Sequence, residues 1–123
     1  MKDLKSIITD DLSHCLICGS TNVCYHHALE GTANRALSDE DNLIVPLEPR
    51  LHNEGSRPQT GVRCDVHHCK NMAMLMHIIG QLAWERKYFL DALDYVTEEE
   101  GFSENCAEEA RKQFRKRYGK SYI

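Results

Sequence analysis

Closely spaced histidines and cysteines are the residues of this chain that are best suited to chemistry. His26 and His27 are adjacent, and Asn42, His52 and His67 follow at intervals along the chain. Imidazole nitrogens bind divalent metals and exchange protons near neutral pH, so a paired histidine can serve two tasks. Adjacent side chains of a strand point to opposite faces, so at most one of the pair is ordinarily buried. We interpret one imidazole as a metal ligand and its neighbour as a general base that deprotonates water.

The cysteines suggest a second kind of metal site. Cys15 and Cys18 form a C-x-x-C pair in a predicted tight turn, the form of a zinc knuckle. Two thiolates are half of a structural zinc site, and the candidates for the other half are Cys64, His67 and Cys69 in RCDVHHCK. The alternative is that these are ordinary thiols of a small reduced protein.

Length and composition are those of one compact globular domain. The 123 residues are 41% hydrophobic and 28% charged, with no apolar run near the ~20 residues that span a bilayer. We therefore expect a single domain over residues 1–123, with a core at about 13–90 and a helical extension at about 91–123. The beginning, MKDLKSIITDDL, is too acidic for a signal peptide, which predicts a cytoplasmic protein with reduced thiols and no membrane segment.

The net charge of −4 argues against a nucleic-acid partner, but its distribution weakens that argument. Acidic residues crowd the stretch 91–109, and a basic tail follows. Arg115 and Lys116 in this tail are candidate phosphate contacts. The alternative is that acidic residues early and basic residues late in a final helix only complement its dipole.

The hydrophobic pattern predicts short strands followed by long helices, which is an α+β fold. We expect a short helix at 3–12, a strand at 23–29, and a second strand at 43–45, before Pro46. GTANRALSDEDN reads as a polar loop with at most one helical turn, and NEGSRPQTG as a loop.

Two helices are expected in the second half of the chain. From about Val66, apolar residues recur at the spacing of an amphipathic helix: they are Met72, Leu75, Met76, Ile79, Leu82 and Ala83. This helix should continue as far as a break at Gly101, and a final helix, capped by Ser103, should end near Gly119. Aromatic residues beyond the apolar stripe could pair with a second copy of the chain or pack on the final helix: Trp84, Tyr88 and Phe89.

Taken in order, these motifs resemble the HNH or His-Me finger nucleases, in particular the small HNH-like proteins of bacteriophages. The resemblance is carried by C-x-x-C, by HH followed by GTANRALSD, by NLIVPLEPRLH and by a later VH. It covers residues from about 15 to 90 and continues loosely to RKRYGKSYI. It implies a ββα-metal fold with short antiparallel strands that cuts DNA with one divalent ion (Mg, Mn, Ni or Zn), in the host cytoplasm if the protein is phage-encoded.

Carried over residue by residue, the resemblance makes His26 a metal ligand and His27 the general base. Asn42 would orient that base, His52 would be a second metal ligand, and His67 is the candidate third ligand. The roles of Asn42 and of the metal ion fit the reaction. Phosphodiester hydrolysis needs an oriented base that activates water and a cation that stabilises the developing negative charge.

Arg35, between the two expected strands, is a candidate for gripping a phosphate with its guanidinium fork. It could equally pair with Asp39 or Asp41 on the surface. Asn34 lies in the same stretch as Asn42, and we prefer Asn42 because it directly precedes the second strand.

The chain also departs from the family pattern. Related proteins often carry C-x-x-H after the second strand, where this chain has Glu48 and Leu51. A structural zinc is then either lost or held by Cys64 with His67 or Cys69, and in the first of these pairings His67 would not also serve the catalytic ion.

Two classes of function follow from these residues and their order. The favoured one is a metal-dependent DNA endonuclease acting in phage recombination, genome processing or packaging, with a homodimer making double-strand cleavage easier. The alternative is a non-catalytic, zinc-stabilised module that binds nucleic acid or protein. Hydrolysis of another phosphoester uses the same chemistry and has less support from the residues.

Overall fold

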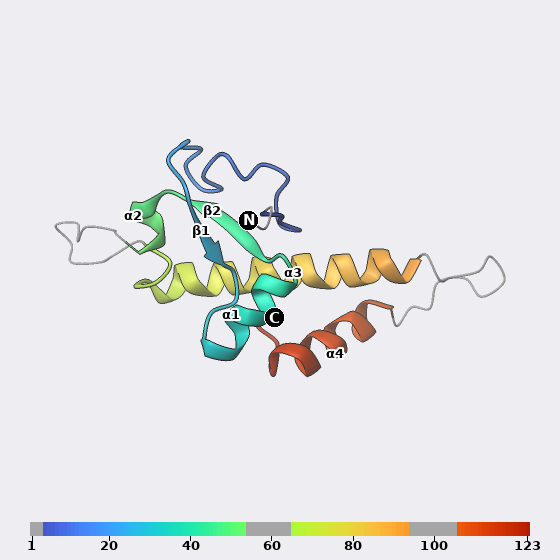
Figure 1. Ribbon diagram of the computed structural model, residues 1–123. Helices are drawn as coiled ribbons and strands as arrows, with labels where there is room; N and C mark the ends of the chain where they lie inside the picture. Colours follow the sequence, from blue (N-terminus) through green and yellow to red (C-terminus); the bar gives the residue numbers. More distant parts are fainter. Residues whose placement is uncertain (1–3, 54–64, 94–105) are drawn as a thin grey trace.

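A computed structural model describes residues 4–53, 65–93 and 106–123. Its elements, in chain order, are β1 (Cys24–His27), α1 (Thr32–Glu40), β2 (Ile44–Leu47), α2 (Pro49–His52), α3 (Lys70–Leu93) and α4 (Cys106–Tyr118). The fold is therefore α+β, with a two-stranded antiparallel sheet and long helices, as the pattern predicted (Figure 1). None of the helices in the described ranges combines the length and the apolar character needed to cross a bilayer.

The two strands pair so that His26 lies opposite Val45 and His27 opposite Ile44. All four residues of β2 are buried, which fits the apolar, β-branched content that predicted a strand here. The strand runs one residue past Pro46, although we expected it to end before that residue. Pro46 is tolerated because a two-stranded sheet has only edge strands, where a missing N–H need not break the ladder.

The polar stretch between the strands is a nine-residue helix, α1, so the prediction of a loop with at most one helical turn was wrong. Its contact with the core is partly polar, because Leu37 packs against the core beside Ser38. Ser38 is fully buried, and its hydroxyl donates to the carbonyl of Leu43 at 3.1 Å. Because a leucine and a serine rather than a full apolar stripe face inward, hydrophobic periodicity gave little helical signal.

Residues 4–12 do not form the helix expected at 3–12. Side chains in this segment bond to their own backbone neighbours: the Ser6 hydroxyl accepts from the N–H of Ile8 at 3.0 Å, and Thr9 Oγ1 accepts from the N–H of Asp11 at 3.1 Å. Such local bonds compete with helix formation. The segment instead lies against the second strand, because the Ser6 hydroxyl also donates to the carbonyl of Ile44 at 2.6 Å.

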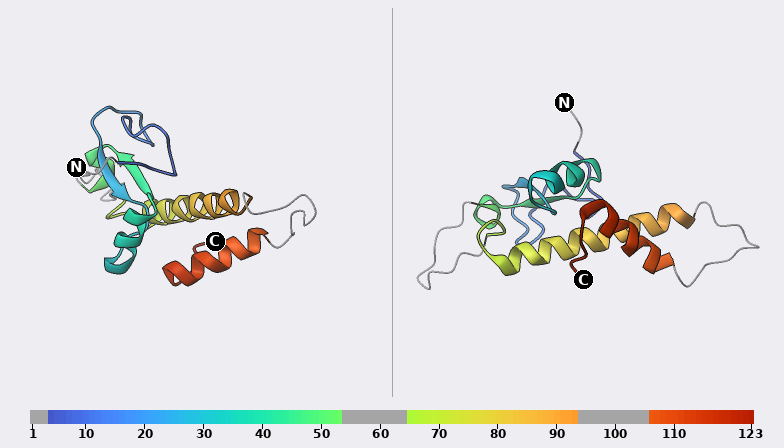
Figure 2. Two further views of the ribbon diagram at one scale, coloured as in Figure 1. Left: turned by 45° about the vertical axis from the view of Figure 1, so that its right-hand side comes forward. Right: turned by 90° about the horizontal axis from the view of Figure 1, so that it is seen from below.

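The long helix α3 confirms the predicted amphipathic helix and lies along α4 in all views (Figures 1 and 2). Met76 is buried, whereas Leu75 and Leu82 of the expected apolar stripe are each 51% exposed. Trp84 makes an edge contact with Phe114 of α4, with ring centroids 5.6 Å apart. It therefore packs on the final helix, one of the two alternatives for this residue.

Gly80 lies within α3, where a glycine is usually unfavourable. A Cβ atom placed on it would lie 3.0 Å from the Cβ of Ala28 and 3.6 Å from Leu29 Cγ. Ala28 and Leu29 directly follow β1 and are fully buried. The glycine thus allows the end of β1, with its two histidines, to approach the long helix closely.

The helix α4 is held by Ala110, Phe114 and Tyr118, which are buried. It ends as predicted near Gly119, whose φ of 86° suits a glycine at a helix end. The expected helix cap at Ser103 and the predicted loop at 54–61 lie outside the described residues, as does Cys64. Arg115 and Lys116 are exposed on α4.

Candidate metal centre

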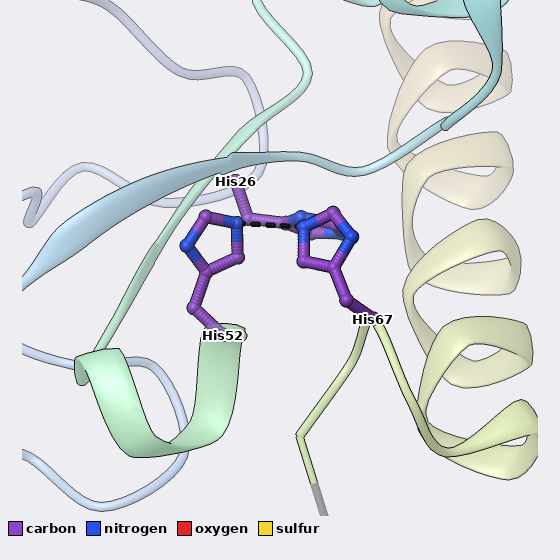
Figure 3. Close-up of side chains that lie close together, drawn as sticks. All are labelled: His26, His52 and His67. Atoms are coloured by element: carbon purple, nitrogen blue, oxygen red, sulfur yellow. Dashed lines mark hydrogen bonds between the residues drawn. The ribbon is translucent and has the colours of Figure 1, made fainter. Parts of the chain in front are cut away.

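Three histidines from separate parts of the chain converge on one point. His26 comes from β1, His52 from the last residue of α2, and His67 from the segment before α3 (Figure 3). One nitrogen of each ring lies within 4.8 Å of a nitrogen of both others, and the Nε2 atoms of His52 and His67 are 2.9 Å apart. Three imidazoles at this spacing can bind a metal ion, and this is the one such group among the described residues.

His26 forms the buried side of the centre. It is only 2% exposed, and its Nε2 atom has no hydrogen-bond partner among the described residues. Burial, aided by the neighbouring His52 and His67, lowers the pKa of His26 to about 3. The ring is therefore neutral at physiological pH, which is the state in which imidazole binds a metal.

The other two imidazoles have contacts at their second nitrogens. Nδ1 of His52 lies 3.1 Å from the Cys24 thiol sulfur, and Nδ1 of His67 lies 3.5 Å from Glu30 Oε2. In both rings Nδ1 has a contact outside the histidine group, and Nε2 faces the other ring. This division between the two nitrogens is typical of metal-binding histidines. A donor set of three imidazoles, one of them with a buried nitrogen that has no partner among the described residues, fits a divalent transition metal.

The three histidines line a cavity of about 530 Å³. The other lining residues are Tyr25, His27, Glu30, Gly31, Arg35 and Asn53. The fold thus brings the predicted base His27 and the predicted phosphate contact Arg35 into the same cavity as the three predicted metal ligands.

The structure places Asp39 rather than Asn42 next to His27. His27 Nε2 lies 3.5 Å from Asp39 Oδ1, and no hydrogen bond joins Asn42 to His27 within the described parts of the chain. Asn42 instead lines a separate cavity beside Trp84. Its φ of 58° lies in the left-handed region, which asparagine tolerates better than most residues, so the asparagine shapes the turn between α1 and β2.

The C-x-x-C turn has the local form of a knuckle, but its surroundings differ from the predicted zinc site. Burial alone would raise the pKa of Cys15, but N–H groups of Cys18, Glu48 and Ile17 outweigh it and lower that pKa. The Cys18 thiol donates to Glu48 Oε2 at 3.1 Å, and Glu48 Oε1 accepts from Arg50 Nε at 2.7 Å.

Glu48 therefore contacts the C-x-x-C turn through Cys18. Cys69 does not join Cys15 and Cys18 in a three-ligand group in the part of the chain that the structure describes. Cys64, the fourth predicted zinc ligand, lies outside the described residues.

Several contacts of the centre were not predicted from the sequence, namely those of Cys24, Glu30, Asp39 and His77. Glu30 lies only four residues after His26, and its carboxylate is 3.8 Å from that imidazole. This short separation along the chain could have indicated the contact. No motif marks it, because the chain leaves β1 between the two residues and neither strand nor helix spacing applies. Asp39 is on α1, the helix that hydrophobic periodicity did not reveal.

The sequence matches no protein-family model, and the comparisons with curated proteins and with solved structures also gave no match. The functional conclusion therefore rests on the geometry of the centre.

Proposed function

We propose that this protein is a metal-dependent endonuclease that hydrolyses DNA phosphodiester bonds, and that β1, β2 and α2 form a ββα-metal core. The observation that carries the proposal is that His26, His52 and His67 converge in one cavity that His27 and Arg35 also line. The order HH, N, H along the chain, which resembles that of the His-Me finger nucleases, supports the same function.

His26, His52 and His67 would hold the ion, which when bound supplies a positive charge that stabilises the developing charge on the phosphate and leaving oxygen. His27 is 24% exposed, so one of its nitrogens can reach a water molecule in the cavity. Asp39, 3.5 Å from Nε2 of that ring, favours a proton on Nε2 and leaves Nδ1 free to accept one from water. His27 is thus the general base, and Asp39 is the residue that orients it.

Arg35 supplies the contact to the substrate. It is exposed on α1 and lines the cavity, so its guanidinium can pair with a phosphate oxygen beside the reacting bond. Arg115 and Lys116 on α4 add positive charge that can contact the DNA backbone elsewhere.

Plasmid nicking tests this function. Purified protein is incubated with supercoiled plasmid and Mg²⁺, Mn²⁺, Ni²⁺ or Zn²⁺, beside the His27→Ala variant and a chelator control. We expect metal-dependent nicking that falls by about 100-fold or more in His27→Ala, the loss typical of a missing general base. His14→Ala, which removes an exposed histidine bonded to Asp11, is the matched control and should cut at the wild-type rate.

A non-catalytic module that binds nucleic acid is the alternative outcome of the same experiment. The contact between Cys18 and Glu48 favours it, because Glu48 departs from the C-x-x-H pattern often found in the HNH nucleases that the sequence resembles. Retarded plasmid migration without nicking under any of the four metals would support this alternative and contradict the nuclease.

A further inference from the structure

Buried polar atoms without hydrogen-bond partners gather around one carboxylate, that of Glu30. They are His26 Nε2, Glu30 Oε1, His77 Nδ1 and His77 Nε2, with no partner in the described parts of the chain. Glu30 Oε1 lies 3.8 Å from Nε2 of His26 and 3.8 Å from Nε2 of His77. An ionised carboxylate oxygen in such a position is costly unless positive charge compensates it. The cluster is therefore electrostatically suited to a cation nearby.

The second oxygen of the same carboxylate lies beside His67, a candidate metal ligand, on the side away from His52. Glu30 Oε2 lies 3.5 Å from His67 Nδ1, and His67 Nε2 is the nitrogen that faces His52. A negative oxygen beside Nδ1 favours the tautomer with the proton on Nδ1, which leaves a lone pair on Nε2. Carboxylates in this position orient metal-binding histidines and raise their basicity.

We infer that Glu30 is a positioning residue of the histidine centre, which holds His67 with Nε2 toward the ion and places a negative charge beside His26. The inference deepens the proposed function and rests on it, because it concerns the same centre. The ligand that the centre would take is a divalent transition cation bound by imidazoles.

Glu30 is itself supported by the end of the chain. His77, whose Nε2 faces Glu30, packs against Tyr122 with ring centroids 4.7 Å apart. The backbone N–H of Tyr122 donates to the side-chain oxygen of Gln81 at 2.7 Å, and Gln81 is fully buried. Tyr122 thus packs against the histidine that faces Glu30, and its own backbone is held by a buried side chain.

The test measures cobalt binding, because Co²⁺ bound by imidazoles absorbs visible light according to its ligand geometry. Metal-free full-length wild type, Glu30→Gln, Glu30→Asp and the control Glu108→Gln are titrated with Co²⁺. We expect Glu30→Gln to bind about 10- to 100-fold more weakly with an altered spectrum, the usual loss for a residue that orients a ligand. Glu30→Asp should recover part of the affinity, and Glu108→Gln, exposed on α4, should match the wild type.

A measurement on the wild type alone keeps the inference testable if Glu30→Gln does not fold. Long-range ¹⁵N correlation spectra of the metal-free protein at pH 8 report which nitrogen of each neutral imidazole carries the proton. We expect the proton of His67 on Nδ1. A proton on Nε2 of His67, or Co²⁺ affinity and spectrum unchanged in a folded Glu30→Gln, would overturn the positioning role.

The same samples separate this inference from the nuclease. If Co²⁺ binding depends on Glu30 but the wild type never nicks plasmid, the positioning role stands and the nuclease fails. If the wild type binds no Co²⁺, the positioning role is overturned, whereas nicking with another metal would still support the nuclease.

Discussion

The Nε2 atoms of His52 and His67 lie 2.9 Å apart, a distance at which a hydrogen bond joins the two rings. Such a bond needs a proton on one Nε2 and a lone pair on the other. Because Glu30 favours a proton on Nδ1 of His67, we assign the donated proton to His52. Nδ1 of His52 lies 3.1 Å from the sulfur of Cys24, whose thiol donates to the Leu47 carbonyl at 3.3 Å. A divalent cation held by both Nε2 atoms would displace the hydrogen bond between them, and the proton of His52 would then move from Nε2 to Nδ1, beside the Cys24 sulfur.

Removal of either imidazole should therefore weaken metal binding strongly. We expect His52→Ala and His67→Ala each to lower the affinity for Zn²⁺ by roughly 100-fold or more, since a residue that binds the ion directly should matter at least as much as a residue that orients one. Isothermal titration with Zn²⁺ measures the change. The control His14→Ala should bind Zn²⁺ as tightly as the wild type does. If His67→Ala also bound Zn²⁺ with wild-type affinity, His67 would not be a metal ligand.

Replacing Asn42 separates a backbone role from a catalytic one. The φ of 58° at this position costs most L-residues about 1–2 kcal/mol, whereas glycine adopts it freely. We expect Asn42→Gly to keep both stability and plasmid nicking, and Asn42→Ala to lose about 1 kcal/mol of unfolding free energy while it still cuts. Urea unfolding and plasmid nicking measure the two properties.

If Asn42 orients His27 through its side chain, as the resemblance implies, both variants should lose nicking to the same extent. Asp39→Asn is the informative comparison, because Asp39 is the residue that the structure places 3.5 Å from His27. Nicking reduced in Asp39→Asn but not in Asn42→Gly would assign the orienting role to Asp39.

The metal-free protein should lose stability in acid because of His26. Burial, with the neighbouring histidines, lowers its pKa from 6.5 to about 3 in the folded chain. Between these values the unfolded chain binds a proton that the folded chain does not, so protons favour unfolding. We expect the unfolding free energy to fall from pH 6.5 towards pH 3 by up to about 1.4 kcal/mol per pH unit from this residue.

Urea unfolding at a series of pH values, with chelator present, measures this slope. His26→Gln removes the titrating group and should give a shallower dependence than the wild type. A slope that stays the same in His26→Gln would show that His26 is protonated equally in the folded and unfolded chains.

The parts of the fold that the sequence predicted are those that its apolar residues dictate. The buried strand at Ile44 and Val45 was predicted from its apolar, β-branched content, and the helix around Met76 from its amphipathic stripe; both were found near the expected positions. The helix α1 was missed because it meets the core through only one large apolar side chain, Leu37, and through Ser38, whose hydroxyl donates to a carbonyl within the core. A buried serine leaves no trace in hydrophobic periodicity.

The sequence predicted the three histidines that lie together in the candidate centre, but not the acidic residues beside them. His26, His52 and His67 have side chains whose chemistry marks them in any context. Glu30 and Asp39 are acidic residues of a kind found throughout protein surfaces, and only the path of the chain after β1 brings them to the imidazoles. Their roles depend on tertiary position, which spacing along the sequence does not encode.

Asp41 joins three parts of the fold, and its removal should loosen α4. Its carboxylate accepts from Trp84 Nε1 at 3.0 Å, from Arg117 Nε at 2.7 Å and from the Tyr118 hydroxyl at 2.5 Å. Removing an acceptor that pairs with several donors at a partly buried site leaves those donors unsatisfied. We expect Asp41→Ala to lower the unfolding free energy by about 2–3 kcal/mol, measured by urea unfolding.

Asp91→Ala is the matched control for that change, because Asp91 pairs with Lys87 at 2.6 Å on the exposed face of α3. An exposed pair one helical turn apart contributes about 0.3–0.5 kcal/mol, so this variant should unfold almost as the wild type does. Equal losses in Asp41→Ala and Asp91→Ala would mean that solvent screens the Asp41 contacts as well. A much larger loss in Asp41→Ala would instead show that this carboxylate holds α4 in place. It would thereby also help to hold Tyr122, which follows α4 and packs against His77.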